Sequence, residues 1–76
     1  MNNARRKKLN TVLEQLVEIH TALEEVKDEE QEYFDNIPEN FQSSERYEKA
    51  ENAVAALEDA LSMFDDIADN IENALE

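Results

Sequence analysis

One stretch decides how this chain folds: Asp35-Asn36-Ile37-Pro38-Glu39-Asn40-Phe41-Gln42-Ser43-Ser44. It holds the only turn signal in the 76-residue sequence. Pro38 cannot lie inside a helix, because it lacks an N–H group and its ring clashes with the preceding helical turn. It also disfavours helical geometry at Ile37. We therefore expect two helical segments to meet here, with Ile37 and Phe41 folding back to close the end of a core.

Side chains that cap helices lie on both sides of the proline. Asn36 and Glu39 have the spacing of a capping box, which would let the proline open a single short turn. Ser43 or Ser44 is the expected N-cap of a second long helix. Glu45 then falls in the first turn of that helix, where a negative charge interacts favourably with the helix dipole.

Apolar residues before the turn recur at alternating spacings of three and four, a pattern typical of a helix that packs along one stripe against another helix. This predicted seam consists of Leu9, Val12, Leu16, Ile19, Leu23, Val26, Glu30, Tyr33 and Ile37, and it is flanked by a column of Leu13, His20, Lys27 and Phe34. Only Glu30 breaks the seam. Because an unpaired buried carboxylate is costly, we expect that a nearby cation (Lys27, Arg46 or Lys49) reaches it or that the seam opens to solvent there.

The pattern repeats after the turn. The second predicted seam consists of Tyr47, Ala50, Val54, Leu57, Leu61, Phe64, Ala68, Ile71 and Leu75, and Met63 is expected to join Phe64 in the core. Its flanking column consists of Ala53, Ala60, Ile67 and Ala74, mostly small residues that would let another helix approach closely. Both stripes are wider than a two-column seam, and wide stripes suit bundles of more than two helices.

These patterns predict an all-α fold, an antiparallel two-helix hairpin with a coiled-coil-like seam that makes up a single domain over residues 1–76. The helices are expected over about 4–35 and about 43–75, with the turn at 36–43. A lone pair of helices leaves its flanking columns in water. We therefore expect the hairpin either to form a homodimer, which would be a four-helix bundle, or to lay its apolar side on another protein.

The composition excludes several classes of protein. The absence of Cys removes disulfides, thiolate metal sites and cysteine nucleophiles, and the absence of Gly removes phosphate-cradling loops. No stretch approaches the roughly 20 apolar residues that cross a bilayer, so we expect a cytoplasmic protein without membrane contact. With 20 acidic side chains against 7 basic ones the net charge is -13, which also argues against direct binding of nucleic acid.

The charges are segregated along the chain. Arg5, Arg6, Lys7 and Lys8 precede the first seam residue, whereas all the acidic residues follow it. The predicted partner-binding residues are the densest acidic run and its two aromatic neighbours: Glu24, Glu25, Asp28, Glu29, Glu32, Asp35, Tyr33 and Phe34. The carboxylates either solvate a helical face or stand where a nucleic-acid-binding protein expects phosphates. The aromatic side chains either pack the end of the core or offer contacts to a partner.

The sequence contains no recognisable catalytic arrangement. His20 is the only histidine, and a bimetal bundle would need Glu-x-x-His, whereas position 17 is Val. Asp65, Asp66 and Asp69 lie on a rigid helix that does not wrap an ion as a loop does. We therefore predict a protein that is not an enzyme and has no metal or cofactor.

Residues 28–47 resemble the middle of short acidic proteins encoded by phages, prophages and mobile elements of Gram-positive bacteria. In those proteins an acidic run leads into an Asp-Asn-x-Pro-Glu turn, a Gln-Ser-Ser-Glu cap and a helix rich in Ala, Leu and Glu. This chain has the turn at Asp35–Glu39 and the cap at Gln42–Glu45. The resemblance implies a setting, the cytoplasm of a host cell, in which small acidic phage proteins often inhibit host enzymes or defence systems.

Together these observations favour a non-enzymatic interaction protein that inhibits a nucleic-acid-binding or defence protein by binding its basic surface, as a nucleic-acid mimic. The alternative is a structural oligomerisation module whose acidic face only solvates it. That alternative makes the apolar seam essential and the surface charges dispensable.

Overall fold

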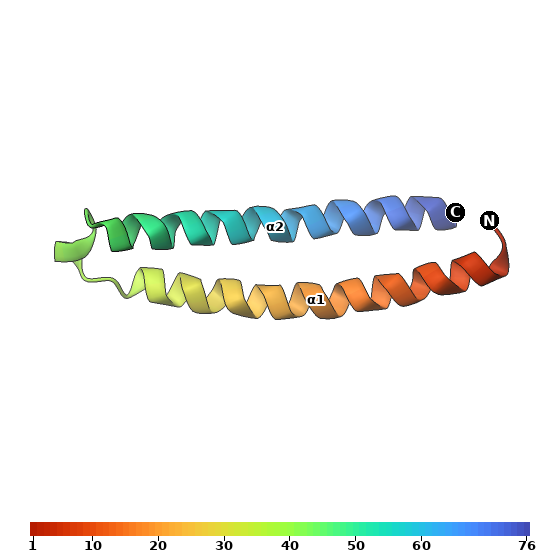
Figure 1. Cartoon of the computed structure of the whole chain (residues 1–76), viewed down its shortest axis with the longest axis horizontal. Coiled ribbons are helices and arrows are strands. Elements are labelled where there is room, and N and C mark those ends of the chain that lie inside the picture. The colour runs from red at the N-terminus through yellow and green to blue at the C-terminus, as the bar shows by residue number, and fades with distance from the viewer.

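The computed structural model describes all 76 residues as two long antiparallel helices joined by a short connection (Figure 1). Helix α1 covers Asn3–Asp35, the 3-10 turn η1 covers Glu39–Phe41, and helix α2 covers Glu45–Leu75. The molecule is a rod of 60 × 16 × 13 Å with both termini at one end. The predicted all-α helical hairpin is confirmed. Neither helix is long and apolar enough to pass through a membrane.

Short polar side chains define where the helices start. The Asn2 side chain accepts a hydrogen bond of 2.9 Å from the backbone N–H of Arg5. Ser44 caps α2, because its hydroxyl accepts a bond of 3.3 Å from the backbone N–H of Tyr47. The prediction of a serine N-cap is therefore confirmed, with Ser44 rather than Ser43 in the role.

The turn differs from the expectation at two residues. The Asn36 side chain donates to the carbonyl of Glu32 at 2.9 Å, so it ends α1 and forms no capping box with Glu39. Pro38 still precedes one short turn, η1. Ile37 closes the end of the core with 5% of its surface exposed, but Phe41 lies exposed.

The seam of α1 is rotated by one column from the prediction. The side chains that face α2 are Leu9, Leu13, Leu16, His20, Leu23, Lys27, Glu30, Phe34 and Ile37. The predicted seam members Val12, Ile19, Val26 and Tyr33 are 38–52% exposed, so that assignment was wrong. Both columns satisfy the same three-and-four spacing, so periodicity cannot choose between them. The structure turns the bulky Leu13 and Phe34 inward, and long polar side chains can join a seam because their tips still reach water.

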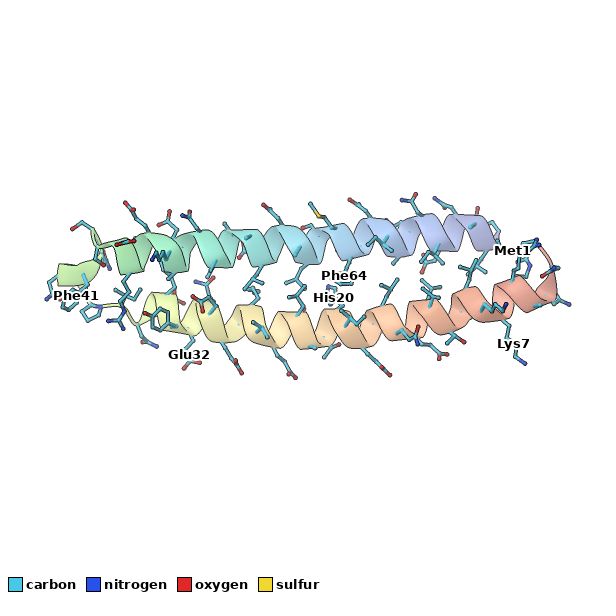
Figure 2. The ribbon with its side chains drawn as sticks, viewed as in Figure 1. Met1, Lys7, His20, Glu32, Phe41 and Phe64 are labelled. Carbon is cyan, nitrogen blue, oxygen red and sulfur yellow. The ribbon has the colours of Figure 1, made fainter.

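Two aromatic pairs fix the register between the helices. The rings of His20 and Phe64 meet edge to face, with centroids 6.1 Å apart, between the two ribbons (Figure 2). The rings of Phe34 and Tyr47 lie 4.8 Å apart near the turn. The predicted seam of α2 faces α1, except that Met63 is exposed rather than part of the core.

The enclosed core is very small. Only Ile37, Ala50 and Val54 are buried. The chain exposes 5830 Å², whereas a compact monomer of 8.8 kDa exposes about 4,800 Å². The hairpin is therefore a linear seam with two long sides, and these sides hold the candidate functional surfaces.

Candidate interaction surfaces

The two edges of the seam carry different chemistry. At one edge, Arg46 donates a hydrogen bond to the Tyr33 hydroxyl and its guanidinium lies 5.3 Å from the centre of the Tyr33 ring. At the other edge, Val17, Asp65 and Glu72 line one pocket. Residues seven apart lie on the same side of a coiled-coil helix. Each residue in these contacts therefore assigns the residues seven positions away from it to the same edge of the hairpin.

The edge marked by Tyr33 and Arg46 is apolar along most of its length. We call it the apolar face, and it consists of Val12, Ile19, Val26 and Tyr33 from α1 with Ala53, Ala60, Ile67 and Ala74 from α2. Ala22, Ala56 and Met63 widen it, and all three are exposed. Its central region contains no acidic residue. Acidic residues lie only along its borders, among them Glu29 and the partly exposed Glu30 beside Tyr33, and basic residues (Arg5, Lys8, Arg46 and Lys49) stand at its two ends.

The opposite edge and the outer surface of α1 carry the carboxylates. Along the seam the acidic edge consists of Glu24, Glu51, Glu58, Asp65 and Glu72. On α1 an outer acidic ridge consists of Glu14, Glu18, Glu25, Asp28, Glu32 and Asp35. Glu32 points away from α2 (Figure 2), and spacings of three, four and seven residues place the other members on the same surface. All eleven of these residues are exposed.

Few of these carboxylates are neutralised. The structure contains two ion pairs between side chains, Lys27–Asp28 at 2.9 Å and Lys49–Glu45 at 3.2 Å. All but two of the 20 acidic side chains therefore have no ion-pair partner. The acidic ridge presents its negative charge to solvent.

The structure divides the predicted partner-binding residues between surfaces. Glu25, Asp28, Glu32 and Asp35 lie together on the acidic ridge. Glu24 lies at the acidic edge, whereas Glu29 and Tyr33 belong to the other side of α1. Phe34 packs against Tyr47 in the seam and is not free to bind a partner.

Lys27 lies in the seam, and its ammonium group pairs with Asp28 on the neighbouring ridge. Its ammonium group has a raised pKa, first because Asp28 accepts its hydrogen bond and then because the Asp28 charge, together with Glu58 and Glu24, attracts it. Partial desolvation acts in the opposite direction. The cation therefore stays charged beside the apolar side chains and offsets part of the acidic edge.

Of the two outcomes predicted for Glu30, pairing with a cation or an opening of the seam to solvent, the structure shows the opening. Each cation that was expected to reach it has another partner: Asp28 for Lys27, Tyr33 for Arg46 and Glu45 for Lys49. Its side chain remains partly exposed and lines an open depression beside Tyr33, Arg46 and Lys49.

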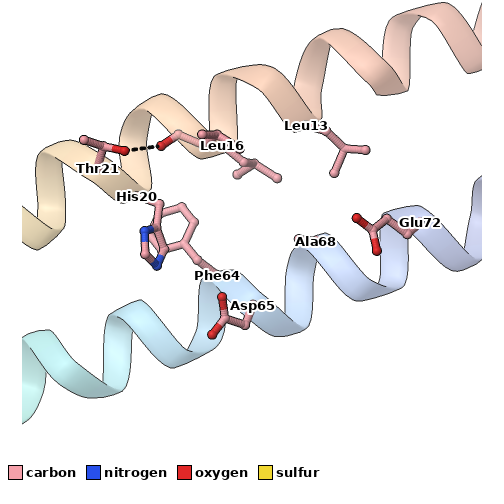
Figure 3. Close-up of a pocket in the computed structure, with 9 residues that line it drawn as sticks. Leu13, Leu16, His20, Thr21, Phe64, Asp65, Ala68 and Glu72 are labelled. Atoms are coloured by element: carbon pink, nitrogen blue, oxygen red, sulfur yellow. Dashed lines mark hydrogen bonds between the residues drawn. The ribbon is translucent and has the colours of Figure 1, made fainter.

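An open pocket of about 290 Å³ lies halfway along the acidic edge (Figure 3). Leu13, Leu16 and Phe64 form its apolar floor, with His20 and Asp65 beside them. The Thr21 hydroxyl donates to the Val17 carbonyl at 3.0 Å, as hydroxyls on helices commonly do. Nowhere in the structure do three or more metal-ligating side chains gather. The edge-to-face contact of His20 with Phe64 gives the imidazole a packing role.

Sequence reasoning missed the apolar face as a continuous surface. The signal was present in the two seven-residue columns that flank the seams, one on each helix. The prediction placed the α1 column (Val12, Ile19, Val26 and Tyr33) in the seam. Only the α2 column was therefore expected to lie outside the seam.

Comparison of the chain with protein-family models, curated proteins and solved structures gives no match. The phage setting implied by the resemblance in residues 28–47 gains no support from these comparisons, and function is argued from the two surfaces.

Proposed function

We propose that this chain is a non-enzymatic interaction protein whose acidic ridge binds a basic surface on a nucleic-acid-binding or defence protein and thereby inhibits it. The observation that carries this proposal is the row of exposed carboxylates on one helix, of which only Asp28 has an ion-pair partner. The resemblance to small phage proteins adds the setting, inhibition in the cytoplasm of a host cell.

The spacing of the ridge supports mimicry of a phosphate backbone. Its four members nearest the turn (Glu25, Asp28, Glu32 and Asp35) are three or four residues apart, which corresponds to about 4.5 or 6 Å along a helix. Phosphates along one DNA strand advance about 3.4 Å per nucleotide. A basic cleft built for a phosphate row therefore meets an ordered row of negative charges about 1.5 times as widely spaced along its axis, and its binding releases counterions in the same way.

The rigidity of the support also favours this function. The ridge lies on a 33-residue helix that packs along its length against α2. A charge row that is already ordered loses little conformational entropy on binding. A disordered acidic tail of the same charge would have to order at that step.

The test neutralises the ridge while retaining its shape. The ridge variant carries Glu25→Gln, Asp28→Asn, Glu32→Gln and Asp35→Asn. A control with the same net charge neutralises the acidic residues that α2 contributes to the acidic edge, namely Glu51→Gln, Glu58→Gln, Asp65→Asn and Glu72→Gln. Both proteins and the wild type are titrated, by fluorescence anisotropy, against a panel of purified basic nucleic-acid-binding proteins, with duplex DNA as competitor and circular dichroism to check helicity.

We expect wild-type binding that weakens with salt, that duplex DNA displaces, and that the ridge variant loses by at least about tenfold, or 1.4 kcal/mol. The control should stay within about threefold of the wild type. The proposal fails if the ridge variant binds as the wild type does, if both variants lose affinity equally, or if no member of the panel binds.

A second candidate function is a structural oligomerisation module. The apolar face favours it, because that surface is continuous and remains uncovered in the isolated hairpin. The two functions use different sides of the molecule, so a single protein can have both.

A further inference from the structure

We propose that the apolar face is covered by a second copy of this chain, which forms an antiparallel four-helix bundle with both acidic ridges outside. This inference does not rest on the proposed function, because the apolar face and the acidic ridge share no residue. Three independent observations carry it: exposed area, the distribution of charge, and the match in side-chain size across the face.

The exposed area has the size that a dimer needs. The hairpin exposes about 1,000 Å² more than a compact monomer of its mass. A stable interface of standard size removes about 800 Å² from each partner. Covering the apolar face would thus return the chain to the exposure of a normal small protein, with Ile19, Val26 and Ile67 in a core rather than half in water.

The charge distribution selects a copy of the chain as the occupant. Each copy has a net charge of -13, so two copies can associate only through a surface that keeps carboxylates apart. The apolar face is that surface, since its central region contains no acidic residue. The basic residues at its two ends would lie within reach of acidic side chains on the rim of the second copy.

The sizes of the side chains on the two helices are complementary. The contact between Tyr33 and Arg46 sets a register that, at seven-residue steps, places Val26 level with Ala53, Ile19 level with Ala60, and Val12 level with Ile67. The larger side chains of α1 thus alternate with an alanine-rich row on α2. When α1 of one copy lies on α2 of the other, Val26 and Ile19 meet alanines and only Val12 meets a large residue, Ile67. The helix axes can therefore approach to about 8–10 Å.

The test measures molar mass by light scattering across a range of chain concentrations and at low and high salt. The face variant carries Ile19→Lys and Ile67→Lys. The matched control carries Val17→Lys and Thr21→Lys, which make the same change in charge at exposed positions on the acidic side of α1. Neither pair belongs to the enclosed core, and circular dichroism checks that both variants remain helical.

We expect the wild type and the control to have twice the 8.8 kDa of the chain, and the face variant to have the mass of one chain. Salt should strengthen the dimer by screening its net charge, whereas it weakens binding of a basic partner to the ridge. The proposal is overturned if the wild type remains at 8.8 kDa at all concentrations, or if the face variant dimerises as well as the wild type.

Discussion

Glu30 is the acidic residue of the seam, and it has no ion-pair partner. Its carboxylate stays in contact with water, and the helices lose apolar contact at that level. We expect Glu30→Leu to raise the free energy of unfolding by about 1 kcal/mol, since partial burial of a leucine is worth roughly that amount. The corresponding rise in Tm is about 4–8 °C, measured by circular dichroism melts at equal chain concentration.

Glu32→Leu provides the control for this change. It also replaces a glutamate by leucine, two residues away on the acidic ridge. There the new leucine has no apolar side chain to contact. We expect its Tm to stay within about 2 °C of the wild type, because substitutions at such surface sites usually have small effects. A marked loss of stability in Glu30→Leu would show instead that the carboxylate makes a polar contact that the fold requires.

Individual side-chain positions were the part of the structure that the sequence predicted least well. Tyr33 and Phe34 are adjacent and both aromatic, yet one contacts Arg46 at the surface and the other packs on Tyr47 in the seam. Their separation of about 100° around the helix axis decides this difference. Both columns of α1 have the same periodicity, so the spacing alone does not tell which of them faces α2. Which predicted contact residues lie in the seam and which at the surface is therefore seen only when both helices are in place.

The start of α2 depends on one hydroxyl. Ser44 accepts a hydrogen bond from the Tyr47 N–H and donates one to the Phe41 carbonyl, so it joins the helix to η1. We expect Ser44→Ala to lower the free energy of unfolding by about 1 kcal/mol, a typical cost for a lost N-cap. Urea denaturation of the variant and the wild type measures the difference.

Ser43→Ala is the matched control, because Ser43 is exposed and precedes the cap. We expect a change of less than about 0.5 kcal/mol, as for other surface substitutions. Equal losses in the two variants would mean that the connection as a whole, rather than the Ser44 cap, stabilises this end of the hairpin.

At the scale of elements, the sequence was sufficient to predict the two helices and the connection between them. Pro38 lies within the connection and Ser44 marks its end, and the two runs of three-and-four spacing predict two long helices that must return antiparallel. The Asn36 error is local: an asparagine side chain can bond forward into a new turn or back to the helix it ends, and here it bonds back to Glu32. Both uses satisfy a backbone group that would otherwise be unpaired.

At the scale of the molecule, an extended shape separates the two surfaces. The radius of gyration is 17.5 Å, whereas a compact chain of this length has about 11 Å. In a rod only two helices thick, each column of residues outside the seam stays at the surface along its whole length. An acidic surface and an apolar one can therefore run side by side, and a dimer that buries the apolar face leaves the acidic ridge accessible.

The two copies can be arranged so that α1 of one lies on α2 of the other, or so that equivalent helices lie on each other. The first arrangement brings Glu29 of each copy level with Lys49 of the other, in the register set by Tyr33 and Arg46. We expect Glu29→Lys to weaken the dimer about fivefold, since it places like charges at two symmetry-related contacts. Lys49→Glu should have a similar effect.

The double variant Glu29→Lys/Lys49→Glu restores opposite charges at both contacts and should recover the affinity of the wild type. Sedimentation equilibrium of the four proteins gives the dissociation constants, and circular dichroism corrects for the lost contact between Lys49 and Glu45 within α2. Recovery supports the arrangement of α1 on α2, because a coupling between two residues requires that they meet. If the two losses simply add, Glu29 and Lys49 lie apart, and the dimer must instead stack equivalent helices.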